Sequence, residues 1–192
     1  IIFATTKPNS LLVWNFGARS VGGRSDFFAL ELVGGKPRLS WGGARTNIAQ
    51  LQLDRKVNTG RLYKVTATRN NRVGSLTVED CTESGEYCKP CQTDDARCFT
   101  KVVGTASSGT LVFKKNPMYF GGVGPDIQHV LDRPGQLSSV DFIGCVKSIS
   151  INGNERSLFS ESLNRTGLKR TCNRQVLTSN TDGRPRAGAG GP

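Results

Sequence analysis

The chain has 192 residues, 36% of them hydrophobic, and carries a formal net charge of +11. This length suits one domain with a single sizeable core, and we expect a tail rather than a second domain. No apolar run approaches the roughly 18 residues of a membrane span. The 23 glycines favour short elements joined by tight turns over a helical bundle.

Short strand-like runs follow one another along the chain. They are rich in β-branched and aromatic residues, and several alternate apolar with polar residues, as half-buried antiparallel strands do. The predicted strands are residues 10–14, 27–32, 38–41, 63–68, 74–78, 110–113, 118–120 and 145–151. Turn residues separate them at Gly34-Gly35, Asn70-Asn71, Gly121-Gly122 and Asn152-Gly153. Many short strands with frequent turns predict an all-β sandwich or barrel.

The last part of the chain lacks such strands. Residues 157–170 show no sustained period and are expected to form a loop. Residues 173–192 are rich in Gly, Arg, Pro, Ser and Thr, which predicts a disordered tail or linker. Because the chain opens at Ile1 without an initiator Met or a signal peptide, we expect a fragment of a longer protein.

The six cysteines form an even set, and four of them lie in one polar stretch. They are Cys81, Cys88, Cys91, Cys98, Cys145 and Cys172. Such usage favours a disulfide framework made in an oxidising, extracellular compartment. Four thiolates could also hold zinc, but structural zinc sites usually present two close pairs, and this stretch has one Cys-x-x-Cys. We therefore expect two disulfides among the four, with all three connectivities open. Asn164 begins a glycosylation sequon, consistent with a secreted protein.

An ordered series of motifs runs through the chain. The motifs are Phe3-Ala4-Thr5-Thr6, Leu11-Leu12-Val13-Trp14, Asp26-Phe27-Phe28-Ala29-Leu30-Glu31-Leu32, Asn58-Thr59-Gly60-Arg61-Leu62-Tyr63-Lys64-Val65, Tyr119-Phe120-Gly121-Gly122-Val123, Phe142-Ile143-Gly144-Cys145 and Ile151-Asn152-Gly153. In this order they resemble the laminin G-like (LNS) domain family over nearly all of residues 1–172. The run from Asp141 to Cys145, after Arg133-Pro134-Gly135, is most similar to the copies in Fat-like giant cadherins, with laminin α chains next.

The resemblance implies a jelly-roll-like antiparallel β-sandwich over residues 1–172, with a cysteine-rich insertion at 79–100. It also implies a structural disulfide between Cys145 and Cys172. Family members are adhesion and matrix modules that bind proteins or glycans through the loops of one rim. Deleting residues 80–100 is expected to leave a folded domain, because the insertion interrupts a place where a short hairpin would join two strands.

Many family members hold calcium at this rim, with one acidic or amide ligand after the strand that ends at Trp41 and a second ahead of Gly121-Gly122. A hard cation needs such oxygen ligands. The chain has no Asp or Glu between Glu31 and Asp54, nor between Asp95 and Asp126. Trp41 stands about where the first carboxylate would be, and the second place falls near residues 112–114. We therefore expect no metal and no cofactor.

Charge is spread unevenly. The chain has 26 basic and 15 acidic residues. The segment 79–100 holds two of the basic and six of the acidic residues, which leaves 24 basic and 9 acidic residues elsewhere. The candidate glycan-binding residues are Lys36, Arg38, Arg45, Lys114 and Lys115, which fall where calcium would have bound. Such a basic rim could attract a sulfated glycan, and the alternative is a solvated basic surface without a ligand.

No catalytic constellation is apparent. The one histidine, His129, and the acids Asp132 and Asp141 are unaccompanied by any activated nucleophile motif. A nucleic-acid recognition motif is also absent. We therefore expect no enzyme activity and no nucleic-acid partner.

The sequence leaves three functions open. The first is an extracellular adhesion or matrix module that recognises a cell-surface or matrix protein without calcium. The second is a module that binds heparan sulfate, and the third is a structural spacer in a large ectodomain. The parent protein would be either a secreted matrix protein or the ectodomain of a membrane-anchored one.

Overall fold

The computed structural model describes residues 1–17, 26–42, 48–104, 111, 113, 117–122, 140–163, 165 and 167–172. Within them the strands are β1 (Ile2–Ala4), β2 (Ser10–Phe16), β3 (Phe27–Val33), β4 (Lys36–Gly42), β5 (Ala49–Gln52), β6 (Tyr63–Asn70), β7 (Val73–Asp80), β8 (Phe99–Val103), β9 (Tyr119–Phe120), β10 (Cys145–Ile151) and β11 (Asn154–Arg156). None of these residues forms a helix with the length and apolar character needed to cross a membrane.

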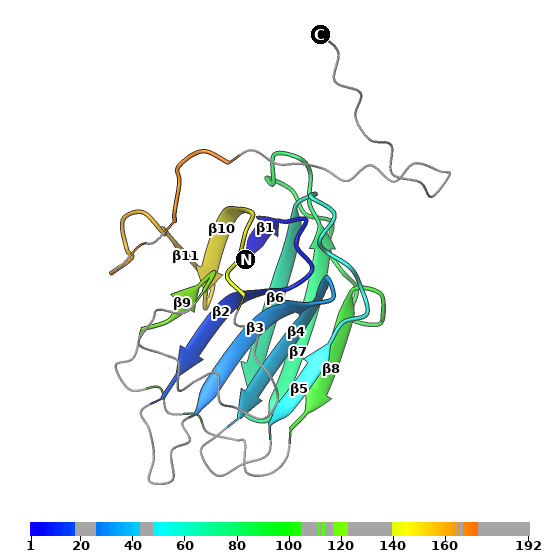
Figure 1. Cartoon of the computed structure of the whole chain (residues 1–192). Helices are drawn as coiled ribbons and strands as arrows, with labels where there is room; N and C mark the ends of the chain where they lie inside the picture. Colours follow the sequence, from blue (N-terminus) through cyan, green and yellow to red (C-terminus); the bar gives the residue numbers. More distant parts are fainter. Residues whose placement is uncertain are drawn as a thin grey trace.

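The strands form two antiparallel sheets that pack face to face (Figure 1). The six-stranded sheet has the order β11-β10-β1-β6-β7-β8, and the five-stranded sheet has the order β5-β4-β3-β2-β9. The short strand β1 lies between β10 and β6, where Ile2 is opposite both Ser148 and Lys64. The first and last parts of the described chain therefore meet inside one sheet, and the expected all-β sandwich is confirmed.

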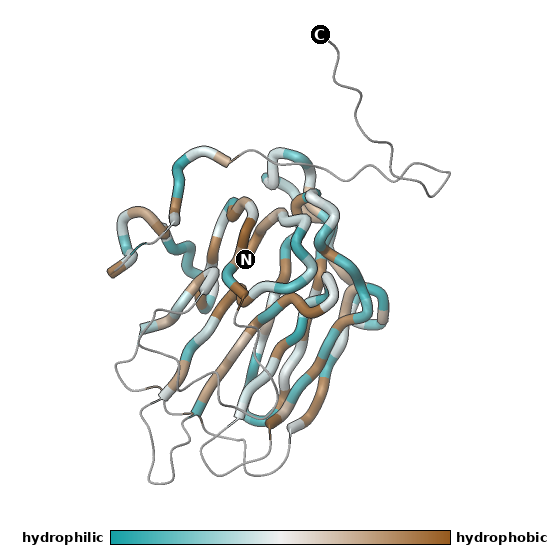
Figure 2. Tube along the Cα trace, in the orientation of Figure 1, coloured by the Kyte–Doolittle hydropathy of each residue, from teal (hydrophilic) through white to brown (hydrophobic). Residues whose placement is uncertain are grey.

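Alternation along the strands explains why the sheets pack in this way. Figure 2 shows hydrophobic and hydrophilic residues interleaved along them. On β7, Gly74, Leu76 and Val78 are buried while the residues between them are half-exposed. Because successive side chains of a strand point to opposite faces, one face of this strand enters the core and the other meets water.

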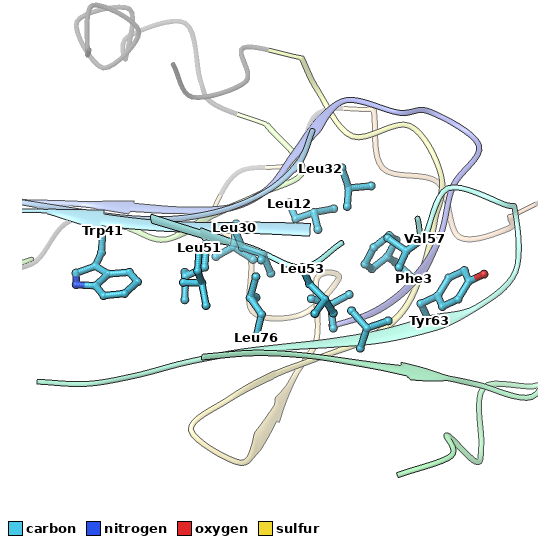
Figure 3. Close-up of a cluster of buried hydrophobic side chains, with 14 of the residues drawn as sticks. Phe3, Leu12, Leu30, Leu32, Trp41, Leu51, Leu53, Val57, Tyr63 and Leu76 are labelled. Atoms are coloured by element: carbon cyan, nitrogen blue, oxygen red, sulfur yellow. The ribbon is translucent and has the colours of Figure 1, made fainter. Parts of the chain in front are cut away.

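The main core fills the space between the two sheets (Figure 3). Its largest fully buried side chain is that of Trp41, which packs against the backbone of Gly74 across the sandwich. A Cβ at Gly74 would lie 2.3 Å from the indole atom Cη2 of Trp41. The absence of a side chain at residue 74 is thus what admits the large indole on the facing sheet.

A second apolar cluster lies on the opposite face of the five-stranded sheet. Trp14 stacks between Phe16 and Phe27, with ring centroids 6.1 and 5.6 Å away, and Phe16 stacks on Tyr119 at 5.9 Å. On β2, Leu11 and Trp14 belong to this cluster and Leu12 and Val13 to the main core, with a register shift between Leu11 and Val13. Strand β2 is therefore apolar on both faces, which accounts for its continuous run Leu11-Leu12-Val13-Trp14.

Seven of the eight predicted strands correspond to β2, β3, β4, β6, β7, β9 and β10 and are confirmed. The prediction for residues 110–113 is not supported, because Leu111 and Phe113, the two that are described, lie outside any strand. Strand β7 pairs instead with β8, which begins directly after Cys98. Within residues 79–100, Glu79 and Asp80 belong to β7 and Phe99 and Thr100 to β8, which leaves residues 81–98 between the two strands. Strands β1, β5 and β11 were also missed.

Candidate binding surfaces

The sandwich has two ends, at which different chain segments gather (Figure 1). At one end β7 stops at Asp80 and the chain makes a two-disulfide excursion, residues 81–98, before β8. We call residues 81–98 the flap and this end the flap end. At the other end lie the turn between β6 and β7, the last residue of β4, Gly42, and the last residue of β8, Val103. We call it the turn end.

Neighbouring cysteines pair within the flap. Cys81 is bonded to Cys88 and Cys91 to Cys98, each across a separation of 7 residues. Cys145 is bonded to Cys172, 27 residues further on. Of the three connectivities left open by the sequence, the structure has the one that makes two small consecutive loops.

Both ends of the flap are buried in the domain. Cys81 and Cys98 are both buried, and Cys81 packs in a small cluster with Ala4, Leu62 and Cys145. The middle of the flap is largely exposed. The flap is therefore attached to the domain through buried ends while its middle faces solvent.

Charged contacts hold the base of the flap in place. Lys64 Nζ lies 2.6 Å from Glu79 Oε2, and the backbone N–H of Cys91 donates to Glu79 Oε1 at 3.3 Å. The Arg55 guanidinium forms an ion pair with Asp80 and lies 5.9 Å from the ring centroid of Tyr63. Two of the six acids in residues 79–100, Glu79 and Asp80, are thus paired with cations from outside that segment.

A third acid is paired within the flap. The Arg97 backbone N–H and guanidinium donate three hydrogen bonds of 2.8 to 3.0 Å to Asp95. These hydrogen bonds lower the pKa of Asp95 to about 2. The effective charge of the flap is consequently smaller than a count of its acids indicates.

The first flap loop is a tight hairpin with an aromatic side chain on its surface. The Thr82 N–H donates to the Tyr87 carbonyl at 2.8 Å, and the Gly85 N–H donates to the Thr82 carbonyl at 2.9 Å. Gly85 has φ of +72° and is packed so closely that a side chain there would meet Leu62 and Lys147. The side chain of Tyr87 is 59% exposed, while hydrogen bonds fix the backbone of the hairpin.

The structure describes two of the five candidate glycan-binding residues, and both have acidic partners. Lys36 Nζ lies 2.6 Å from Asp54 Oδ1, and the hydrogen bond from Lys36 lowers the pKa of Asp54. The Arg38 guanidinium lies 3.1 Å from Glu31, whose side chain is fully buried. Neither cation is an unpaired exposed charge of the kind that the sequence argument assumed.

The two described candidate residues, Lys36 and Arg38, both lie in the first half of β4. Lys36 opens β4 at the flap end, whereas Gly42 closes it at the turn end, about 20 Å away for a strand of this length. Arg45, Lys114 and Lys115 lie outside the described residues. The pairing of Glu31 with Arg38 could have been found in the sequence, since the turn at Gly34-Gly35 sets Glu31 opposite Arg38.

Two other cations at the turn end were not singled out from the sequence. Arg72 lies in the turn between β6 and β7, and Lys101 lies on the edge strand β8, and both are exposed. Among the described residues, no acid forms an ion pair with either. The predicted turn at Asn70-Asn71 indicated that Arg72, the next residue, would lie at an end of the sandwich.

A shallow hollow lies at the flap end. It is lined mainly by apolar atoms, from residues Lys7, Pro8, Asn9, Val140, Asp141 and Ile143. Its backbone is fixed, because the Leu11 N–H donates to the Val140 carbonyl at 2.8 Å and Thr5 Oγ1 donates to the Ile143 carbonyl at 2.6 Å. Val140 and Ile143 are nonetheless 48% and 61% exposed.

Of the residues considered for catalysis and metal binding, the structure describes Trp41 and Asp141. Trp41 is fully buried in the core, and Asp141 is exposed beside Gly122. His129 and Asp132 lie outside the described residues, as does Asn164 of the sequon, whose neighbours Leu163 and Arg165 are exposed. Within the described part of the chain, no three His, Cys, Asp or Glu residues are placed to hold a metal ion.

The fold defines a class of protein. Domains LG4-5 of the mouse laminin α1 chain have a similar structure, with a TM-score of 0.61 at 15% identity over 93% of this chain and 40% of that one. At this identity the likeness establishes the jelly-roll β-sandwich of laminin G domains and nothing finer. The family model described as "Laminin G domain" matches residues 3–156, and the chain therefore belongs to the laminin G domain family.

Relatives with similar sequences are much longer proteins. The chain is 31% identical to human protocadherin Fat 4 over 172 residues, 90% of this chain and 3% of the relative. It is 29% identical to mouse laminin subunit alpha-1 and 28% identical to human neurexin-2, over 93% and 91% of this chain and 5% and 10% of theirs. At the level that the family defines, the chain is an extracellular binding module.

Proposed function

We propose that this domain is an adhesion or matrix module that recognises a cell-surface or matrix protein, without calcium and without enzymatic activity. Its domain would extend over residues 1–172 and include the flap. The relatives named as a protocadherin, a neurexin and a laminin subunit support an adhesive or matrix role by family membership.

The apolar hollow at the flap end is the observation that supports a protein partner. Pro8, Val140 and Ile143 expose apolar atoms around a backbone held by hydrogen bonds. Apolar side chains of a protein gain free energy by leaving water in such a hollow, whereas a sulfated glycan offers mainly charged and hydroxyl groups. Because the backbone is already ordered, little conformational entropy is lost on binding.

Calcium independence is supported by the place of Trp41. The indole fills the core against Gly74, so residue 41 offers no oxygen ligand at the rim, where calcium-binding family members carry an acidic or amide side chain. A cation that bound the folded domain would raise its melting temperature by mass action. We expect the melting temperature to be the same in millimolar calcium and in EDTA, and a clear rise with calcium would contradict the proposal.

Binding itself is tested with a fluorescent tetramer of the domain on suspended cells, since avidity makes weak contacts detectable. We expect equal staining in calcium and in EDTA. Ile143→Asp places a charge in the hollow and should abolish staining, while the control Leu163→Asp changes a residue that is 93% exposed and should leave it unchanged. Staining by the Ile143→Asp variant at the level of the parent would contradict the assignment of the hollow.

Heparan sulfate binding is the second candidate, and the exposed cations at the turn end favour it. The sequence contains three further cations besides Arg72 and Lys101. Arg45 lies in the segment after β4, and Lys114 and Lys115 lie in the segment after β8. Exposed contacts of this kind are individually weak and screened by salt. Reversal of Arg45, Lys114 and Lys115 together should lower the salt concentration that elutes the domain from heparin, and unchanged elution would contradict this candidate.

A further inference from the structure

Residues 157–172 follow the last strand of the described chain and lie outside both sheets (Figure 1). Those that the structure describes form turns and irregular backbone. Near the start of the segment the Glu161 N–H donates to the Ser157 carbonyl at 3.0 Å. At its end Cys172 is bonded to Cys145, the buried first residue of β10. The segment is therefore a loop that a disulfide ties to the sandwich at its far end.

A pair of basic residues, Lys169-Arg170, lies near the end of this loop. Every residue from Gly167 to Cys172 is exposed. Within the described part of the chain, residues 168–172 make no backbone hydrogen bond. Exposed loops of this kind are preferred sites of proteolytic nicking. A backbone without sheet or helix hydrogen bonds can also enter a protease as an extended strand while the rest of the domain stays folded.

The two cations of this pair are accessible to a protease. Among the described residues, no acid forms an ion pair with Lys169 or Arg170. The Arg170 guanidinium lies 4.7 Å from the ring centroid of Phe159, a residue of the same loop, so this contact does not fix Arg170 to the sheets. Endoproteases that select paired basic residues bind both cations in acidic subsites, where charge complementarity gives specificity. The Lys169-Arg170 pair presents this recognition element.

A second basic pair, Arg55-Lys56, is held in the opposite way. Val57, which follows it, is fully buried, and its N–H donates to the Gly35 carbonyl at 2.8 Å. The Arg55 guanidinium is paired with Asp80. A protease could reach the bond between Lys56 and Val57 only after this part of the core had opened. The two pairs thus differ in exposure, and exposure favours Lys169-Arg170.

We propose that the bond between Arg170 and Thr171 is a processing site for a secretory-pathway endoprotease that recognises paired basic residues. Hydrolysis breaks the C–N bond with one water, which leaves a carboxyl group on Arg170 and an amino group on Thr171, so no oxidant or reductant is needed. Because Cys172 is bonded to Cys145, the piece that begins at Thr171 stays attached to the domain. The product is a two-chain domain, and its second chain is released only when this disulfide is reduced. The cleavage does not depend on the partner proposed above.

Digestion of the folded chain with kexin, an endoprotease that cleaves after paired basic residues, tests the access to this bond. The mass of the unreduced parent should rise by that of one water. Reduction should then separate a piece that ends at Arg170 from one that begins at Thr171, and Arg170→Gln should remove this cut. If the bond survives in the folded parent under conditions that cut it in the reduced and alkylated chain, the proposal is overturned.

Lys56→Arg is the matched control, because it places an arginine ahead of the bond to Val57, as at residue 170. This second bond should stay intact in the folded variant and be cut once the chain is reduced and alkylated. Equal cleavage after residues 56 and 170 of the folded variant would show that exposure does not select the site. The cut parent should also keep a cooperative thermal transition, since every described strand precedes the cut. Loss of that transition would contradict a two-chain domain.

Secretion from cultured animal cells tests whether the processing takes place. The chain would carry a signal peptide before Ile1 and an epitope tag after Pro192. The tag should run at full-length mass without reduction and on a short piece after reduction. Arg170→Gln, or a chloromethyl ketone inhibitor directed at paired basic residues, should keep the tag on the full-length chain. A parent that is secreted uncut, or a short tagged piece that persists in Arg170→Gln, would overturn the proposal.

Discussion

The pairing of Glu31 with Arg38 is the residue contact that most changes the interpretation of the chain's charge. In the sequence Arg38 is one of several cations in a stretch without acids, yet across the hairpin of β3 and β4 it faces a buried carboxylate. A buried carboxylate that loses its cation is costly, whereas an exposed pair contributes little. Arg38 thus contributes to stability and is poorly placed to bind a glycan.

We therefore predict that Arg38→Met lowers the free energy of unfolding by about 3–5 kcal/mol, because Glu31 is left buried without this cation. The double variant Glu31→Leu/Arg38→Met should recover most of the loss. Lys36→Met is the matched control, since its partner Asp54 is largely exposed, and it should cost less than about 1 kcal/mol. Urea unfolding with intact disulfides measures all three, and equal effects of the Arg38 and Lys36 substitutions would contradict this account.

The contact of Gly74 with Trp41 gives a second prediction at this scale. A methyl group at residue 74 would overlap the indole ring, so Gly74→Ala should destabilise the domain by about 1–3 kcal/mol. Ser75→Ala, one residue further and on the outer face of the same strand, removes only an exposed hydrogen bond to Thr68 and should cost about 1 kcal/mol or less. A Gly74→Ala variant as stable as the parent would show that the core accommodates the methyl group.

At the scale of single residues, the sequence predicted the residues that form tight turns. It did not predict the contacts between residues that are far apart in the chain. The turns at Gly34-Gly35 and Asn70-Asn71 were recognisable because such residues adopt the positive φ that tight turns need. The place of Trp41 in the core, and the pairing of Lys36 with Asp54, depend on strands that meet only in the folded chain.

At the scale of elements, the flap combines buried ends with an exposed middle. Replacement of residues 81–98 by a short turn should leave a folded domain, because loop length affects stability only weakly. The loss should be about 1–3 kcal/mol, since the buried side chains of Cys81 and Cys98 are removed. A narrower deletion of residues 82–97 keeps both buried cysteines and should recover much of that loss. Absence of a cooperative thermal transition in both variants would contradict this division of the flap.

Strand prediction was accurate where alternation was strong and failed where strands were short or next to unusual composition. Strand β5, Ala49–Gln52, contains only two apolar residues, and β8 follows Cys98 so directly that its first residues were assigned to the insertion. The disulfide partners within the flap could not be chosen from spacing, because all three pairings of four cysteines are compatible with it.

At the scale of the whole molecule, the family was recognisable because its motifs are spread in order over both sheets. Trp14, Phe27 and Phe142 all pack in apolar clusters. The motifs therefore contain residues that pack the interior of the fold. Binding surfaces were less predictable. They depend on which loops meet at each end of the sandwich and on which charges are already paired there. The number of charged residues in a segment indicates neither of these.

The central claim, that this laminin G domain binds a protein of the cell surface or matrix, is tested most directly by treating cells before staining them with the tetramer in EDTA. Trypsin removes surface proteins, and heparinase removes heparan sulfate. Our account predicts that trypsin abolishes staining and heparinase leaves it unchanged. Loss of staining after heparinase alone would contradict the account and establish the sulfated glycan as the ligand.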